Sequence, residues 1–76
     1  MINVVEYSWD KTKWVREKST PFTKREYAVA YAENEVNGWS TLSSEHHTYR
    51  HDQLHGIYTV YRDSVPWYRY QITRKP

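Results

Sequence analysis

The sequence predicts a small α+β domain, in which a small antiparallel sheet packs against one main helix. Three observations predict this fold class. The N-terminal segment alternates between apolar and polar residues, residues 24–37 carry a helical pattern, and two further alternating segments near the C-terminus flank a turn. An N-terminal strand or hairpin and a C-terminal hairpin would form the sheet of a single domain spanning residues 1–76.

Aromatic residues must fill most of the core. The chain has no cysteine, which excludes disulfides and thiolate metal sites, but it has four Trp and eight Tyr. Each buried aromatic side chain removes about 150–250 Å² from water. No apolar run approaches the roughly 20 residues of a membrane span. The start, MINVVEYSWD, lacks the basic segment of a signal peptide. We therefore expect a cytoplasmic protein without membrane contact.

The N-terminal segment NVVEYSW is typical of a half-buried strand, because Val5, Tyr7 and Trp9 fall on one side of it. Residues 10–12 provide a turn, and KWVREK is expected to run back as a second strand. Pro21 is expected to end that strand, since proline lacks the amide proton that a sheet ladder needs.

The helix predicted at residues 24–37 has a clear start signal. Thr23 and Glu26 match a capping box, in which each side chain accepts from the backbone amide of the other. Phe22 precedes this cap, and Tyr27 occupies the fourth helical position. This pair predicts a hydrophobic staple that sets the angle at which the chain enters the helix.

The same helix is amphipathic. Its apolar side is expected to comprise Tyr27, Ala28, Val29, Tyr31, Ala32 and Val36. Its polar side is expected to comprise Glu26, Glu33, Asn34 and Asn37. Gly38 follows directly and is expected to stop the helix in a left-handed conformation.

Residues 40–55 fit two descriptions. Ser43 or Ser44 is a possible cap for a short helix ending at Gly56, but the few apolar positions also suit a strand and loop. The next segments, GIYTVYRD and WYRYQITR, predict a hairpin whose turn is residues 63–66. One face of this hairpin is expected to pack on the helix with Tyr58, Val60, Tyr68, Tyr70 and Ile72. The other is expected to stay exposed with Ile57, Thr59, Tyr61, Trp67, Arg69 and Gln71.

All four histidines lie within residues 46–55. If this segment were helical, His47, His51 and His55 would recur on one side, but the outer two would be about 12 Å apart along the axis. Zinc–nitrogen bonds are about 2.0–2.1 Å long, so one ion would not reach both. We expect no metal site and no cofactor.

Part of the chain resembles the HicA family of toxin mRNA interferases. The resemblance covers about residues 23–60 and is carried by Asn37-Gly38-Trp39, by HHTYRH at residues 46–51, and by a glycine before the next strand. It implies RNA and antitoxin binding, with His46 as the histidine of RNA cleavage and Tyr49 at the motif's aromatic position. Ser44-Glu45 stands where the family has Gly-Ser.

The residue types of that segment suit RNA cleavage without reference to any family. Attack by a 2′-hydroxyl group needs a general base, a general acid and a cation. His46 or His47, His51 and Arg50 would provide them, with Tyr49 beside them. The alternative is that these histidines lie on a solvated surface without chemistry, and this is the interpretation we prefer.

The leading prediction is a non-enzymatic interaction protein of the phage or mobile-element inhibitor type that binds and modulates a macromolecular partner, a host protein rather than a nucleic acid. Trp, Tyr and Arg are the residues that dominate interface energetics. The expected binding residues are Tyr61, Arg62, Trp67, Arg69 and Arg74. Small inhibitors encoded by phages and mobile elements are similar in size and composition. A single-stranded nucleic-acid-binding hairpin is the other possibility, because aromatic residues with basic neighbours also stack bases. The sequence does not define the oligomeric state.

Overall fold

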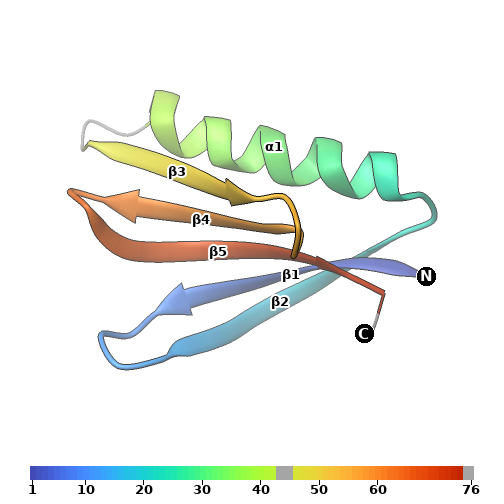
Figure 1. Ribbon diagram of the computed structural model, residues 1–76, viewed down its shortest axis with the longest axis horizontal. Helices are drawn as coiled ribbons and strands as arrows, with labels where there is room; N and C mark the ends of the chain where they lie inside the picture. The colour runs from blue at the N-terminus through green and yellow to red at the C-terminus, as the bar shows by residue number, and fades with distance from the viewer. Residues whose placement is uncertain (43–45, 75–76) are drawn as a thin grey trace.

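The computed structural model describes residues 1–42 and 46–74. The elements in chain order are β1 (Ile2–Trp9), β2 (Trp14–Phe22), α1 (Arg25–Leu42), β3 (His47–Asp52), β4 (Ile57–Arg62) and β5 (Val65–Thr73). The five strands form one sheet in the order β2-β1-β5-β4-β3, and every neighbouring pair is antiparallel. Helix α1 covers one face, and the sheet twists so that β1 and β2 cross the direction of β3 (Figure 1). The predicted α+β fold class is confirmed.

The first hairpin forms where the sequence predicts it. Asp10 closes the turn, because its carboxylate accepts hydrogen bonds from the amides of Thr12 and Lys13. These two bonds, the one from Thr12 first, lower the pKa of Asp10. The expectation that Pro21 ends the second strand is wrong, since β2 continues through Pro21 to Phe22. Strand β2 lies at the edge of the sheet, where a missing amide proton costs little.

The helix begins later than its capping signal predicts. Its first residue is Arg25, and the carbonyl of Lys24 accepts from the amides of Tyr27 and Ala28. Thr23 is therefore not the N-cap, and the expected capping box is wrong. The staple is also wrong. Tyr27 is 52% exposed, and Phe22 instead packs on Tyr31 with 5.3 Å between the ring centroids.

The helix also ends later than predicted, at Leu42 rather than residue 37. Gly38 does not end the helix, because it does not adopt the positive φ of a glycine that stops a helix. Between the two glycines of the chain, Gly56 is the one with positive φ. The reason is a tertiary contact one residue further on. Trp39 packs against the core, and its Nε1 donates a hydrogen bond to the Tyr70 hydroxyl oxygen at 2.9 Å. This contact favours continued helix over a left-handed glycine.

The ambiguous segment before Gly56 is resolved as a strand. Residues 47–52 form β3, which pairs with β4 along its whole length, so the helical alternative for this part is wrong. The suggested serine caps at residues 43 and 44 lie outside the described residues. The second predicted turn is tighter than expected. Asp63 and Ser64 both have positive φ, as a two-residue hairpin turn requires, and β5 begins at Val65.

The core lies between α1 and the sheet. Its buried members are Val4, Ala28, Ala32, Val36, Tyr58, Val60, Tyr70 and Ile72, with Tyr68 partly buried beside them. The predicted helix-facing side of the C-terminal hairpin is thus confirmed. Of the side predicted to be exposed, Trp67 is exposed, whereas Ile57, Thr59, Tyr61, Arg69 and Gln71 are half-buried. The predicted polar side of the helix, Glu26, Glu33, Asn34 and Asn37, is exposed.

Burial raises the pKa values of the tyrosines in and around this core. It is the main reason that the pKa of Tyr58 rises to about 12, and the nearby carboxylate of Glu33 adds to the effect. Tyr31 also reaches a pKa of about 12, first through burial and second through its hydrogen bond to Glu6. Burial likewise raises the pKa values of Tyr68 and Tyr70.

Stability is therefore expected to fall as the pH rises above 10. In the unfolded chain the Tyr58 hydroxyl ionises near its ordinary pKa of 10.0, whereas in the folded protein its pKa is about 12. Between these values the unfolded state binds fewer protons, so the free energy of unfolding decreases by up to about 1.4 kcal/mol per pH unit for a fully buried tyrosine. Urea denaturation across this range measures the slope. Tyr58→Phe should make it shallower, and an unchanged slope would contradict the assignment.

Candidate functional site

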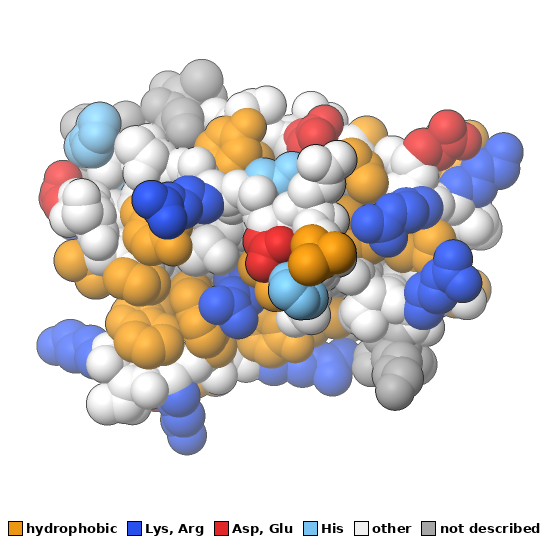
Figure 2. All heavy atoms as spheres, in the orientation of Figure 1, with side chains coloured by type: hydrophobic (Ala, Val, Ile, Leu, Met, Phe, Trp, Pro, Cys, Tyr) orange, Lys and Arg blue, Asp and Glu red, His pale blue; other side chains and the backbone are white. Residues whose placement is uncertain are grey.

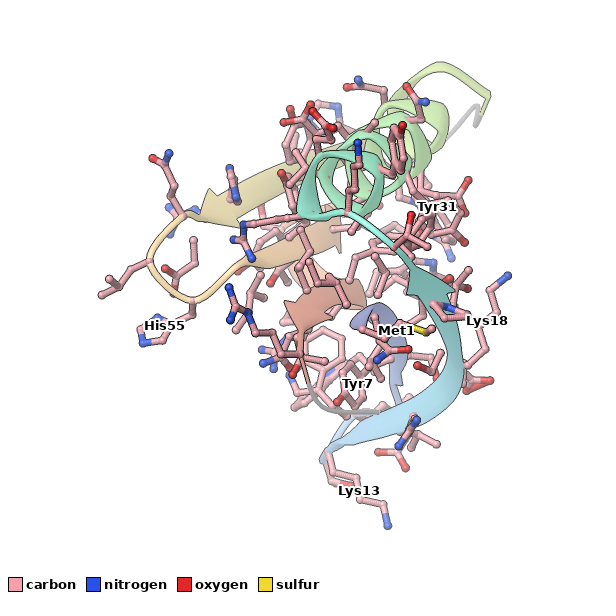
Figure 3. All side chains as sticks on the ribbon, turned by 90° about the vertical axis from the view of Figure 1, so that its right-hand side faces the viewer. Met1, Tyr7, Lys13, Lys18, Tyr31 and His55 are labelled. Carbon is pink, nitrogen blue, oxygen red and sulfur yellow. The ribbon has the colours of Figure 1, made fainter. Side chains whose placement is uncertain are left out.

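The face of the sheet opposite α1, called the helix-free face below, carries a set of large side chains that the core does not use. In register across β2, β1, β5 and β4, residues Arg16, Tyr7, Arg69 and Thr59 lie side by side. Figure 3 shows Tyr7 on the side of the sheet away from α1, whereas Tyr31 projects from α1. The antiparallel order brings the β1–β2 turn and the β4–β5 turn to the same end of this face (Figure 1).

At that end, tryptophans and arginines form stacked pairs. The Arg69 guanidinium carbon lies 4.3 Å from the centroid of the Trp14 ring. Trp14 in turn contacts Trp9, with 5.1 Å between ring centroids. The Arg69 Nε is buried and has no hydrogen-bond partner among the described residues. The guanidinium is thus held by ring contact, which leaves its other N–H groups as donors.

A second pair joins the ends of β4 and β5. The Arg62 guanidinium carbon is 4.7 Å from the centroid of the Trp67 ring, and Trp67 is 38% exposed. We call Trp9, Trp14, Arg62, Trp67 and Arg69 the tryptophan–arginine cluster. Figure 2 shows hydrophobic side chains gathered at this end of β1, β2, β4 and β5, with Lys and Arg side chains among and around them.

Next to the cluster is a surface depression of about 370 Å³, lined by Thr48, Arg50, Tyr61 and Ser64. Thr48 and Tyr61 are direct partners across β3 and β4, and Arg50 follows two residues along the same face. Ser64 comes from the β4–β5 turn. The lining therefore combines three hydroxyl groups with one guanidinium.

Charge is divided between the two faces of the protein. The paired strand positions on the helix-free face hold Arg16, Arg50 and Arg69, with Asp52 as an acid on the same face. Asp52 is engaged by His55, whose Nδ1 lies 2.8 Å from its carboxylate. This contact is the first cause that lowers the pKa of Asp52. The helix layer is acidic, with Glu26, Glu33 and Glu35 on α1.

The histidines do not gather. His47 is buried against Trp39, and both its ring nitrogens lack a hydrogen-bond partner within residues 1–42 and 46–74. His51 stacks on Tyr58 with 4.0 Å between centroids. His55 projects from the β3–β4 turn at the edge of the molecule (Figure 3). In the part of the chain that the structure describes, no three His, Asp or Glu residues are placed to hold a metal ion.

The residues suggested for RNA cleavage are divided by the sheet. Tyr49 and His51 pair with Val60 and Tyr58, which face the helix, whereas Arg50 lies on the helix-free face. His46 is exposed just before β3. One phosphate would not contact both His51 and Arg50 across the sheet. The Ser44-Glu45 position of the family resemblance lies outside the described residues.

The structure brings together most of the predicted binding residues. Tyr61, Arg62, Trp67 and Arg69 lie at one end of the sheet, but Arg74 follows the opposite end of β5. The sequence-based prediction missed Trp9 and Trp14. Alternation puts Trp9 on one face with Tyr7, but only the pairing of β1 with β5 brings this face beside Arg69.

Comparisons with known proteins found no relative of this chain. No protein-family model matches the chain, and neither curated proteins nor solved structures show significant similarity to it. Among the described residues, no helix combines the length and the apolar character needed to cross a bilayer.

Proposed function

We propose that this protein is a non-enzymatic binding protein that contacts a partner protein through its helix-free face and modulates that partner by occupying its surface. The observation that carries the proposal is the tryptophan–arginine cluster, where each arginine is stacked on an indole ring. Trp and Arg are the residues most enriched at energetic hot spots of protein interfaces. A side chain held in place before binding loses less entropy when the complex forms.

The same geometry favours a protein over a nucleic acid. Sheets that bind single strands offer open aromatic rings on which bases stack. Here the Trp67 ring is in contact with Arg62, and the Trp14 ring is in contact with both Arg69 and Trp9. A base would have to displace these contacts, whereas a protein side chain can pack against the combined surface.

Trp67→Ala is expected to weaken partner binding by about 30-fold or more, since truncating a hot-spot residue costs about 2 kcal/mol or more. The melting temperature should stay close to that of the original protein, because Trp67 is 38% exposed on the face opposite the core. Arg69→Ala is expected to behave in the same way. The measurement is affinity capture from host lysate with mass spectrometry, followed by titration of the captured partner against each variant.

Tyr27→Ala is the matched control, because Tyr27 is an exposed aromatic residue on α1, away from the helix-free face. It should retain the partner. A large fall in the melting temperature of Trp67→Ala would contradict its placement outside the core. Enrichment of RNA in place of a protein, with affinity that declines steeply as salt rises, would contradict the choice of partner class.

A further inference from the structure

We infer that the depression lined by Thr48, Arg50, Tyr61 and Ser64 binds a carboxylate group from an acidic side chain of the partner. The inference rests on the proposed function, because it assumes that a protein docks on the helix-free face. It adds the chemical character of that partner, namely an acidic segment whose carboxylate anchors beside the tryptophan–arginine cluster.

The lining of the depression is suited to an anion. Its three hydroxyl groups and one guanidinium can all donate hydrogen bonds, and none of these side chains is engaged in a hydrogen bond or ion pair within the described residues. Among the described residues, no carboxylate lines it. A carboxylate accepts through two oxygens, and a guanidinium donates to both at once in a bidentate pair.

The surroundings reinforce this preference. Arg16 and Arg69 occupy the same face, and Asp52, an acid on that face, is engaged by His55. Asp63 precedes Ser64 at the rim, where it is exposed in the turn. The resulting positive field attracts an acidic segment to this face and away from the glutamates of α1.

The depression matches a carboxylate better than a phosphate. One guanidinium balances the single charge of a carboxylate. Phosphate sites commonly add a helix N-terminus or several cations. Here the lining residues come from β3, β4 and the turn that follows β4, so no helix N-terminus is among them.

The test uses two short peptides and backbone-amide NMR of the full chain. The probe is a peptide of alternating glycine and glutamate with an acetylated N-terminus and an amidated C-terminus. The control peptide has glutamine in place of each glutamate. We expect the glutamate peptide to shift the amide signals of Thr48, Arg50, Tyr61 and Ser64, and the glutamine peptide to leave them in place. Arg50→Gln should weaken this binding about tenfold, as expected for loss of a charge-assisted hydrogen bond.

Arg74→Gln is the control variant, because it also removes one exposed arginine but lies beyond the opposite end of β5. It should bind the glutamate peptide normally. Equal shifts with both peptides, or binding unaffected by Arg50→Gln, would overturn the inference. So would an oligothymidylate that shifts the same amides at lower concentration than the glutamate peptide, since it would assign the depression to phosphate.

This experiment separates the two proposals. Trp67-dependent capture of a protein without peptide binding at the depression would refute the carboxylate site and leave the proposed function standing. Peptide binding at the depression without any captured protein would refute the proposed function, and would leave a carboxylate-binding depression without the partner protein that the inference assigns to it.

Discussion

Replacing Tyr58 with alanine is expected to remove about 3–5 kcal/mol of folding free energy, the usual effect of truncating a buried aromatic side chain. Tyr58 is 1% exposed, and its ring lies beneath α1, where it also stacks on His51. Proteins of this size have a total of about 4–11 kcal/mol at roughly 0.05–0.15 kcal/mol per residue. The variant should therefore lose between about a quarter and all of this stability, and should unfold at a much lower urea concentration than the original protein.

Urea denaturation followed by circular dichroism measures this loss, with Tyr58→Phe as the reference. The phenylalanine variant keeps the ring and removes only the 3.3 Å hydrogen bond to Glu33, so about 1 kcal/mol is expected. If the two variants were equally stable, Tyr58 would not be a core residue, and the assignment of faces in β4 would be reversed.

Replacing Glu6 with leucine is expected to cost about 2–6 kcal/mol, because two tyrosine hydroxyl groups would lose their acceptor at about 1–3 kcal/mol each. Glu6 is 3% exposed within the layer between β1 and α1. Its carboxylate accepts from Tyr31 at 2.8 Å and from Tyr68 at 3.0 Å, and Lys18 lies 3.8 Å away. The carboxylate thus joins α1, β1 and β5 in one polar network.

A combined variant tests this explanation. Adding Tyr31→Phe and Tyr68→Phe to Glu6→Leu removes the donors together with the acceptor, and replacing both partners is close to neutral. Chemical denaturation should show that the triple variant regains most of the lost stability. If it were as unstable as Glu6→Leu alone, the cost would come from packing around residue 6 and not from unpaired hydroxyl groups.

These two changes act on the face of the sheet opposite the proposed binding surface. The core and the Glu6 network lie beneath α1, while Trp14, Trp67, Arg69 and the depression lie on the helix-free face. Stability and binding are therefore expected to respond to different residues. Variants at Trp67 or Arg50 test recognition, and variants at Tyr58 or Glu6 test the fold.

Local pattern alone determined the class of fold and the two faces of its clearest strands. The alternation of Tyr68 and Tyr70 with Trp67 and Arg69 decides which side chains point the same way, because successive residues of any strand point to opposite faces. The apolar spacing of Ala28, Ala32 and Val36 likewise determined the buried side of the helix. These are properties of neighbours in the chain, so they do not depend on the rest of the molecule.

Tertiary structure decided what local pattern left open or indicated wrongly. Trp39 packs against the core and donates to Tyr70, and the helix runs through Gly38 as a consequence. Residues 47–52 became a strand because β4 offers them a free edge, although their own sequence is mostly polar.

The candidate site likewise depends partly on local sequence pattern and partly on tertiary structure. Alternation predicted an exposed Trp67 and Arg69, but the stack of Arg69 on Trp14 joins residues 55 positions apart in the chain. Only the pairing of β1 with both β2 and β5 brings these residues together. A contact of this kind depends on the order of strands in the sheet, and strand order is set by how the whole core packs rather than by any one segment.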